Sequence, residues 1–256
     1  MEKKMMHVAV TADQVGKYVF LPGSVERASL IAEYFDNPVK VAQNREYLTY
    51  TGTLEGVPVS VTSTGIGGPS AAIAVEELYQ CGAHTMMRIG SCASTSPEVH
   101  IGDVVIPNGA IRMEGTSSHY LPLEFPAVPD FGMLKELEKA AIKLGYPYNI
   151  GVTITKDAFY TETAPETMPI YPMLKEKWDS YVRGGCTNTS MECSVLFLVA
   201  ASRGIRMSSV MINATEFEAY DNNFSSYPKD WEHRAIQVGI EAMRQIILKD
   251  KEKETT

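Results

Sequence analysis

Long apolar runs are absent from this sequence of 256 residues. No stretch approaches the roughly 20 apolar residues that a membrane-spanning helix requires, and the start, MEKKMMHVAV, has a basic tip without the apolar run of a signal peptide. Cysteine is also scarce, with four residues and no C-x-x-C pair, so neither a disulfide framework nor a cysteine zinc site is expected. These absences predict a cytoplasmic protein with reduced thiols and no membrane partner.

Positive charge is in short supply as well. The chain has 23 lysines and arginines against 31 aspartates and glutamates, which gives a formal net charge of −8. Such a protein repels polyanions, so no nucleic-acid partner is expected. Hydrophobic residues make up 45% and charged residues 21%, as in ordinary globular domains, which argues against a disordered chain. Any small anionic ligand must therefore be bound by a local cluster of arginines.

The motifs of several large enzyme classes are missing. The sequence contains no G-x-x-x-x-G-K-[ST] phosphate loop, no G-x-G-x-x-G after the first predicted strand, no G-x-S-x-G and no H-E-x-x-H. Kinases, dehydrogenases, α/β-hydrolases and zinc proteases therefore lose their main support. The five histidines lack metal-ligand spacing, so no firm metal site is predicted. They are His7, His84, His100, His119 and His233.

Short β-type runs alternate with longer runs of helical period, which indicates an α/β protein with a central sheet. Strands are expected at 17–21, 39–43, 47–54, 57–63, 85–90, 103–112, 149–155 and 206–213. Helices are expected at 25–35, 69–81, 131–145, 190–203 and 230–248, followed by a frayed charged tail at 249–256. The sequence has no internal repeat, so we expect a single domain over 1–256.

Three predicted strands end in turns that contain glycine, at 20–23, 63–68 and 88–91. In open α/β sheets, ligands bind at the carboxyl ends of strands, where glycine lets backbone N–H groups approach an anion. The three turns therefore predict one shared cleft.

Arginines accompany these turns. Arg27 follows Gly23 on the first turn of a predicted helix, and Arg88 interrupts the apolar run TMMRIGS, where an unpaired charge would be costly. Arg45 opens another strand. One interpretation makes Arg27 and Arg45 surface cations and places Arg88 in a buried salt bridge. The other is that the three, with Ser91 and the Gly23 N–H, bind a doubly charged oxyanion such as phosphate.

The segment TSMECS places Glu192 near the start of an otherwise apolar predicted helix. A carboxylate there is mildly stabilised by the helix dipole, so helix capping is one interpretation. The other is that Glu192 accepts hydrogen bonds from two vicinal hydroxyls, as a ribose requires.

Eight segments together resemble bacterial uridine phosphorylases, a family within the superfamily that also contains the hexameric purine nucleoside phosphorylases. The segments are LPGSVERA, REY, VTSTGIGGPSAAIAVEEL, MRIGS, SSHYLPLEFPAVPDF, GVTITKDAFY, SMECS and VMIN. The resemblance implies a single-domain, three-layer α/β sandwich with a central mixed, twisted sheet. It also implies reversible phosphorolysis of uridine to uracil and ribose 1-phosphate in nucleoside salvage, with phosphate as co-substrate and no required cofactor.

The same resemblance assigns roles to individual residues. Phosphate would be bound by Gly23, Arg27, Arg88 and Ser91, with Arg45 reaching into the neighbouring subunit's site. Arg88 would also act in catalysis, together with Glu192.

For the ribose and the assembly, the resemblance implies contacts between neighbouring subunits. Met191 and Glu192 would hold the ribose, and His7 would cross a dimer interface to its 5′-hydroxyl. Dimers would form a homohexamer. A monovalent cation such as K⁺ at a subunit interface would contact Glu46 and Ser70.

The base half of the expected site departs from the family. Uridine phosphorylases usually follow F-Y with a G-Q-x-R motif that reads uracil, whereas this chain continues YTETAPETMP from Tyr160. The S-D pair that purine enzymes carry after the last strand is also absent, and Asn213 matches the uridine type. The expected base contacts are Phe159, Cys92, Ala93, Tyr160, Thr163 and Asn213. Further candidates to complete the base pocket are Lys156, Glu216 and Tyr220.

Three other functions stay open on sequence alone. One is a purine nucleoside phosphorylase of the same fold. Another is a hydrolytic nucleosidase, against which the arginine cluster argues because such enzymes have no phosphate to bind. The third is a catalytically weak nucleoside-binding protein, suggested by the missing G-Q-x-R motif.

Overall fold

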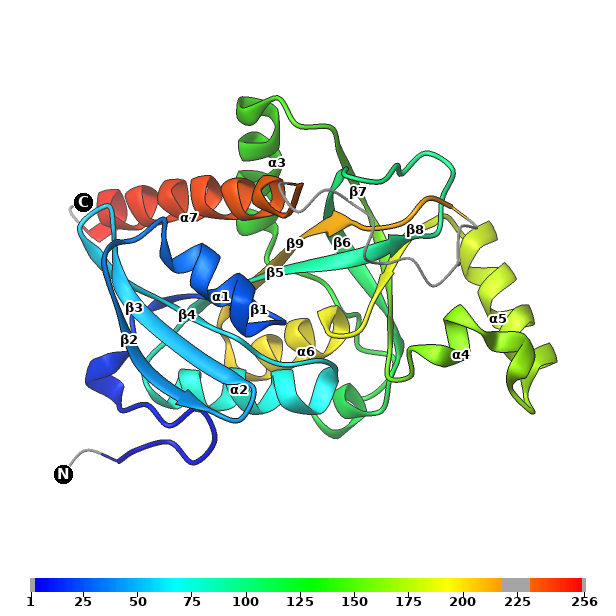
Figure 1. The fold of residues 1–256 in the computed structure, drawn as a ribbon, viewed down its shortest axis with the longest axis horizontal. Coiled ribbons are helices and arrows are strands. Elements are labelled where there is room, and N and C mark those ends of the chain that lie inside the picture. The colour runs from blue at the N-terminus through cyan, green and yellow to red at the C-terminus, as the bar shows by residue number, and fades with distance from the viewer. Residues whose placement is uncertain (1–2, 218–230, 255–256) are drawn as a thin grey trace.

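A computed structural model describes residues 3–217 and 231–254. Within them, nine strands form one sheet in the order β2-β3-β4-β1-β5-β8-β7-β6-β9 (Figure 1). The strands are β1 (Tyr18–Pro22), β2 (Asp36–Asn44), β3 (Tyr47–Leu54), β4 (Val57–Thr62), β5 (Thr85–Ser94), β6 (Val104–Met113), β7 (Tyr148–Lys156), β8 (Cys186–Ser190) and β9 (Arg206–Asn213). The α-helices are α1 (Val25–Ala32), α2 (Gly68–Gln80), α3 (Phe131–Leu144), α4 (Tyr160–Thr163), α5 (Tyr171–Arg183), α6 (Cys193–Arg203) and α7 (Glu232–Glu254). Short 3-10 helices span Ala12–Gln14, Thr116–His119 and Pro165–Thr167.

Helices cover both faces of the sheet, which confirms the predicted α/β sandwich. One face carries α1, α3 and α7, and the opposite face carries α2 and α6 (Figure 1). Each layer has its own apolar core, because α7 packs along α3 on one side and α6 packs along α2 on the other. The sheet therefore has an apolar core on each of its two faces and is buried between them.

Strand β5 organises the sheet, because it pairs with three neighbours. It runs parallel to β1 and to β9, and its last residues, Ala93 and Ser94, pair antiparallel with β8. The path β5-β8-β7-β6-β9 returns to β5, so this end of the sheet closes into a ring. A mixed sheet was predicted and is confirmed, whereas its closure was not predicted.

The strands and helices expected from apolar periodicity are present, and the elements that were missed are polar or exposed. Strand β8 has the sequence CTNTS, whose buried side chains are mostly hydroxyls and amides. Helices α4 and α5 contain no buried hydrophobic residue, so they leave no apolar stripe to detect. All three lie next to one another along the chain, between β7 and α6.

The predicted frayed tail at 249–256 is wrong for the residues that the structure describes, because α7 continues to Glu254. Asp250 holds this end of the helix against the sheet by accepting hydrogen bonds from Tyr18 Oη at 3.0 Å and Arg206 Nη1 at 3.1 Å. Burial, reinforced by the hydrogen bond to Asp250, raises the pKa of Tyr18 to about 12. The charged sequence of this tail did not indicate Tyr18 and Arg206 as partners, because both are distant from it in sequence.

This contact predicts a stability effect for Asp250→Asn. Burial raises the pKa of Asp250, but hydrogen bonds from Arg206 and Tyr18 outweigh it and leave that pKa below its ordinary value. The ionised form therefore stabilises the fold at neutral pH, and we expect the substitution to lower the free energy of unfolding by about 1 kcal/mol. Because the stabilisation is present above the unfolded-state pKa of about 3.9 and lost as pH falls through the lower folded-state value, the difference should disappear in strong acid.

Urea denaturation at several pH values measures this difference. Asp179→Asn is the matched control. The pair of Asp179 with Lys175 is an exposed i,i+4 pair, so this substitution should change stability by less than about 0.5 kcal/mol. Equal effects of the two substitutions at pH 7 would contradict a specific role for Asp250.

Candidate functional site

A cavity of about 590 Å³ lies where β1, β4, β7 and β8 end, over the second half of β5. The three glycine-containing turns all contribute to it, as predicted: Gly23 follows β1, Gly65 and Ile66 follow β4, and Ser91 belongs to β5. The predicted site residues that line it are Gly23, Arg27, Arg88, Ser91, Cys92, Ala93, Phe159, Tyr160, Met191 and Glu192, and the further candidate Lys156 lines it too.

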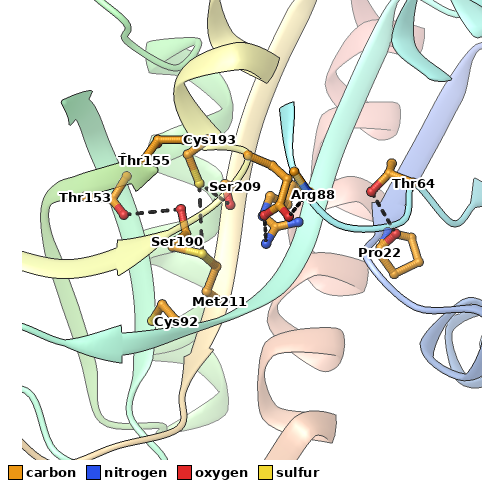
Figure 2. A network of polar contacts seen from close by, with 12 residues as sticks. Pro22, Thr64, Arg88, Cys92, Thr153, Thr155, Ser190, Cys193, Ser209 and Met211 are labelled. Atoms are coloured by element: carbon orange, nitrogen blue, oxygen red, sulfur yellow. Dashed lines mark hydrogen bonds and ion pairs between the residues drawn. The ribbon is translucent and has the colours of Figure 1, made fainter. Parts of the chain in front are cut away.

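Arg88 and Glu192 form a buried ion pair at the floor of the cavity. The Nη2 atom of Arg88 lies 2.5 Å from Oε2 of Glu192, and each residue is 4% exposed. Figure 2 shows Arg88 on β5, with the polar contacts of Cys193 to Ser209 nearby. Arg88 does form a buried salt bridge, as one interpretation predicted. Its partner is Glu192, the other residue for which a catalytic role was predicted.

Glu192 is held by the backbone of a second helix. Its Oε1 accepts a hydrogen bond of 2.8 Å from the N–H of Gly67, the residue that precedes α2. Gly67 has φ of +89°, a conformation that favours glycine, and this turns its N–H toward the carboxylate. Although Glu192 occupies the N-cap position of α6, its side chain makes no capping hydrogen bond, so the capping interpretation is wrong.

Local sequence explains how the Arg88 side chain fits inside the sheet. Arg88 is followed two residues later by Gly90, where an added Cβ would lie 2.6 Å from Nη2 of Arg88. The missing side chain at Gly90 therefore leaves the space that the guanidinium occupies. A larger residue at this position would push Arg88 away from Glu192.

Arg88 keeps hydrogen-bonding capacity for a ligand. Within the described residues, its Nε and Nη1 atoms are buried and donate to no protein acceptor. Arg27 lies in the same cavity, is 9% exposed, and its Nη2 is 3.1 Å from Oε1 of Glu232, so it is not the simple surface cation of the alternative interpretation. Buried N–H donors without acceptors are unfavourable, so this arrangement fits an oxyanion bound between the two arginines.

The side of the cavity formed by β7 and α4 has a different character. Phe159 and Tyr160 provide an aromatic wall with ring centroids 5.4 Å apart, and Nζ of Lys156 lies 5.6 Å from the centre of the Phe159 ring. Lys156 is 7% exposed and forms an ion pair with Glu162, which also accepts a hydrogen bond of 3.1 Å from Oγ1 of Thr189. Glu162 was not predicted as a site residue. Its only sequence signal is a carboxylate within the segment where the family motif is missing.

Several predicted site residues do not line the cavity. Asn213 is fully buried in β9, and its Nδ2 donates to the carbonyl of Thr215 at 2.7 Å. Thr163 donates to the carbonyl of Phe159 at 3.4 Å, and Glu216 accepts a hydrogen bond from the N–H of Ile101 at 3.0 Å. Tyr220 lies outside the described residues.

The residues expected at subunit interfaces also lie outside the cavity. Arg45 is exposed, with a φ of +52°, and Nδ1 of His7 lies 2.7 Å from Oε1 of Glu77. Ser70 donates a hydrogen bond of 2.6 Å to Glu46, which lowers the pKa of that carboxyl group. Their predicted roles stay predictions in a single chain.

Metal and thiol chemistry find no support in this site. Among the described residues, no group of three or more His, Cys, Asp or Glu side chains is arranged to hold a metal ion. Cys92 lines the cavity, but burial raises the pKa of its thiol, which therefore stays protonated and is a poor nucleophile. Among the helices of residues 3–217 and 231–254, none is both long and apolar enough to cross a membrane.

Comparison with known proteins identifies relatives that cover nearly the whole chain. Residues 17–240 match the family described as the phosphorylase superfamily. The uridine phosphorylase of Treponema pallidum (strain Nichols) is 42% identical over 244 residues, which cover 95% of this chain and 95% of that protein. The uridine phosphorylase of Thermococcus kodakarensis is 39% identical over 255 residues, or 99% of this chain and 90% of that protein. The guanosine phosphorylase of Halorubrum lacusprofundi is 33% identical over 247 residues, or 94% and 98%.

The free donors of Arg88 predict stabilisation by inorganic phosphate. Phosphate that binds the folded state alone should raise the melting temperature, with a gain in stability of about 2.7 kcal/mol at 100 times the dissociation constant. In Arg88→Met this response should be lost. Arg203→Met is the control, because Arg203 pairs with Glu76 away from the cavity and should leave the response intact.

Differential scanning fluorimetry with phosphate and with chloride of matched ionic strength measures the response. Each variant is compared with itself, because removing Arg88 leaves the buried Glu192 unpaired and lowers the baseline stability. An undiminished phosphate response in Arg88→Met would show that the anion binds elsewhere.

Proposed function

The chain belongs to the phosphorylase superfamily, and on that premise we propose that it is a uridine phosphorylase. It would catalyse the reversible phosphorolysis of uridine to uracil and ribose 1-phosphate, a pentosyl transfer that needs phosphate as co-substrate and no further cofactor. The observation that carries the proposal is the contact of Arg88, which has free buried donors, with Glu192, a carboxylate that is otherwise held by one backbone N–H. The full-length relatives named uridine phosphorylase support the choice of base over the purine alternative.

The reaction requires charge stabilisation on both sides of the bond that breaks. As the bond between C1′ and N1 lengthens, its electron pair goes to the base and the sugar gains oxocarbenium character. Phosphate held by Arg88 and Arg27 would lie beside C1′, stabilise that positive charge and then form the new C–O bond. The base anion takes up a proton, which balances the proton that the phosphate loses when it becomes the ester, so the products are uracil and ribose 1-phosphate.

Glu192 would orient both reactants. Its carboxylate would accept hydrogen bonds from the ribose hydroxyls, while its contact with Arg88 fixes the distance between sugar and phosphate. Because the Gly67 N–H donates a hydrogen bond to this carboxylate, the position of the carboxylate is set before substrates bind. This step does not need a general acid with a shifted pKa.

The assembly belongs to the same proposal. We propose a cytoplasmic homohexamer, built from three dimers, that acts in nucleoside salvage. Arg45 and His7 would complete the phosphate and ribose sites of a neighbouring subunit, and K⁺ would bind near Glu46 and Ser70. The supporting observation is that Arg45 and His7 both lie outside the cavity of their own chain. A residue needed in the site would then have to come from another copy.

Uracil release from uridine tests the proposed reaction directly. We expect release that depends on phosphate, and a loss of about 100-fold or more in kcat/KM for Arg88→Met, which removes the main phosphate donor. Arg203→Met should retain wild-type activity. Release at an equal rate without phosphate would instead indicate a hydrolytic nucleosidase.

The same assay with other substrates separates the remaining alternatives. Inosine and guanosine should be phosphorolysed much more slowly than uridine, and a preference for them would indicate a purine enzyme. Thermal stabilisation by uridine without turnover of any nucleoside would contradict the proposal and indicate a binding protein.

A further inference from the structure

A second buried ion pair, between Lys156 and Glu162, borders the cavity and is separate from the Arg88 and Glu192 pair. Lys156 ends β7, and Glu162 lies on α4. Their side chains are 9% and 8% exposed. Burying two charges costs more free energy than a packed apolar pair would, so this pair calls for a functional explanation.

The order of the strands places Lys156 on the side of the cavity away from the phosphate donors. The turns after β1 and β4, with Gly23 and Gly65, form one side. The sugar ligand Glu192 follows β8, which pairs with the end of β5. β7 is the next strand beyond β8, so a nucleoside whose phosphate partner lies at Arg88 would direct its base toward Lys156 and Phe159.

We propose that Lys156 is the residue that recognises and stabilises the leaving pyrimidine, and that Glu162 and Thr189 position it. The Nζ atom would donate a hydrogen bond to a ring carbonyl oxygen of the base. This inference rests on the proposed function, because it names the group that takes up the charge generated in the reaction. Lys156 is then a catalytic residue, and Glu162 is a positioning residue.

The contacts of Lys156 leave it able to donate into the cavity. An ammonium group has three N–H donors, and Glu162 is its one anionic partner within hydrogen-bonding distance among the described residues. The ammonium also lies over the Phe159 ring, which fixes its direction by a cation–π contact. Glu162 in turn is fixed by the hydroxyl of Thr189, a residue that lines the cavity.

The electron balance explains why a cation is useful at this place. When the bond between C1′ and N1 breaks, its electron pair passes to the base and spreads onto the carbonyl oxygens. A buried ammonium stabilises that developing anion more strongly than water does, because the surroundings have a low dielectric constant. The proton stays on Nζ during this step.

The charges around Lys156 determine the pH range in which it can act. Burial lowers the pKa of Lys156, whereas Glu162 on α4 and Glu192 before α6 oppose that shift. Lys156 must be protonated to act, so activity should fall as pH rises through its pKa. Removing the charge of Glu162 should lower that pKa and move the alkaline limb of the profile to lower pH.

Leaving-group dependence gives the first test. Single-turnover phosphorolysis of uridine and 5-fluorouridine is measured for wild type, Lys156→Met and Lys175→Met. Lys175→Met is the control, because Lys175 is an exposed lysine on α5. Lys156→Met should lose about 100-fold on uridine and markedly less on 5-fluorouridine, because fluorine stabilises the base anion and reduces the need for the ammonium. Lys175→Met should match wild type on both substrates.

The pH profile of Glu162→Gln gives a second test that does not depend on the folding of Lys156→Met. We expect an alkaline limb displaced to lower pH, with the acid limb unchanged. An unmoved alkaline limb, or equal losses on the two substrates in Lys156→Met, would overturn the role of Lys156 while leaving uridine phosphorolysis by the wild type intact. Absence of that wild-type reaction would overturn the proposed function, and this inference with it.

Discussion

The ion pair between Arg88 and Glu192 is the contact on which the geometry of the cavity depends. Arg88 lies on β5, in the middle of the sheet, and Glu192 lies at the start of α6. Glu192 also accepts a hydrogen bond from Gly67, which lies at the start of α2, so the contact joins one strand to the starts of two helices. Each charge would be costly to bury alone, so the three segments are held in one arrangement. The helices α2 and α6 also pack against each other in one apolar core, which keeps their starts close together.

Three cations line the cavity although the protein has a formal net charge of −8, and each of them is paired. Arg27, Arg88 and Lys156 are each matched by a carboxylate, namely Glu232, Glu192 and Glu162. Pairing with a carboxylate offsets part of the cost of burying each cation, and the cation can still donate its remaining N–H groups. The positive potential is thus confined to a few donors that face the cavity, and the acidic surface can repel larger anions.

The side of the cavity that we propose binds phosphate and sugar could be predicted from the sequence, because that side is made by apolar strands that end in glycine turns. The positions of Gly23, Arg88 and Glu192 follow from strands and helices whose periodicity is strong. The ion pair itself was not predictable, since Arg88 and Glu192 are 104 positions apart and each has several other plausible partners. Asn213 shows the opposite error: its type matched the family, yet its amide donates to the carbonyl of Thr215, just after β9, and does not line the cavity.

The side that we propose binds the base was harder to predict for a related physical reason. It is built from β8, α4 and the loop between β7 and α4, where buried groups are polar or the helix has no buried face. Such elements gain little from apolar burial and leave no periodic pattern, so their form depends on specific contacts such as those of Glu162 with Lys156 and Thr189. Because the two apolar cores do not depend on these contacts, residues on this side can change without loss of the fold. A departure from the family pattern there is therefore compatible with the proposed phosphate and sugar site, and the proposed base contacts lie in the region with the least structural constraint.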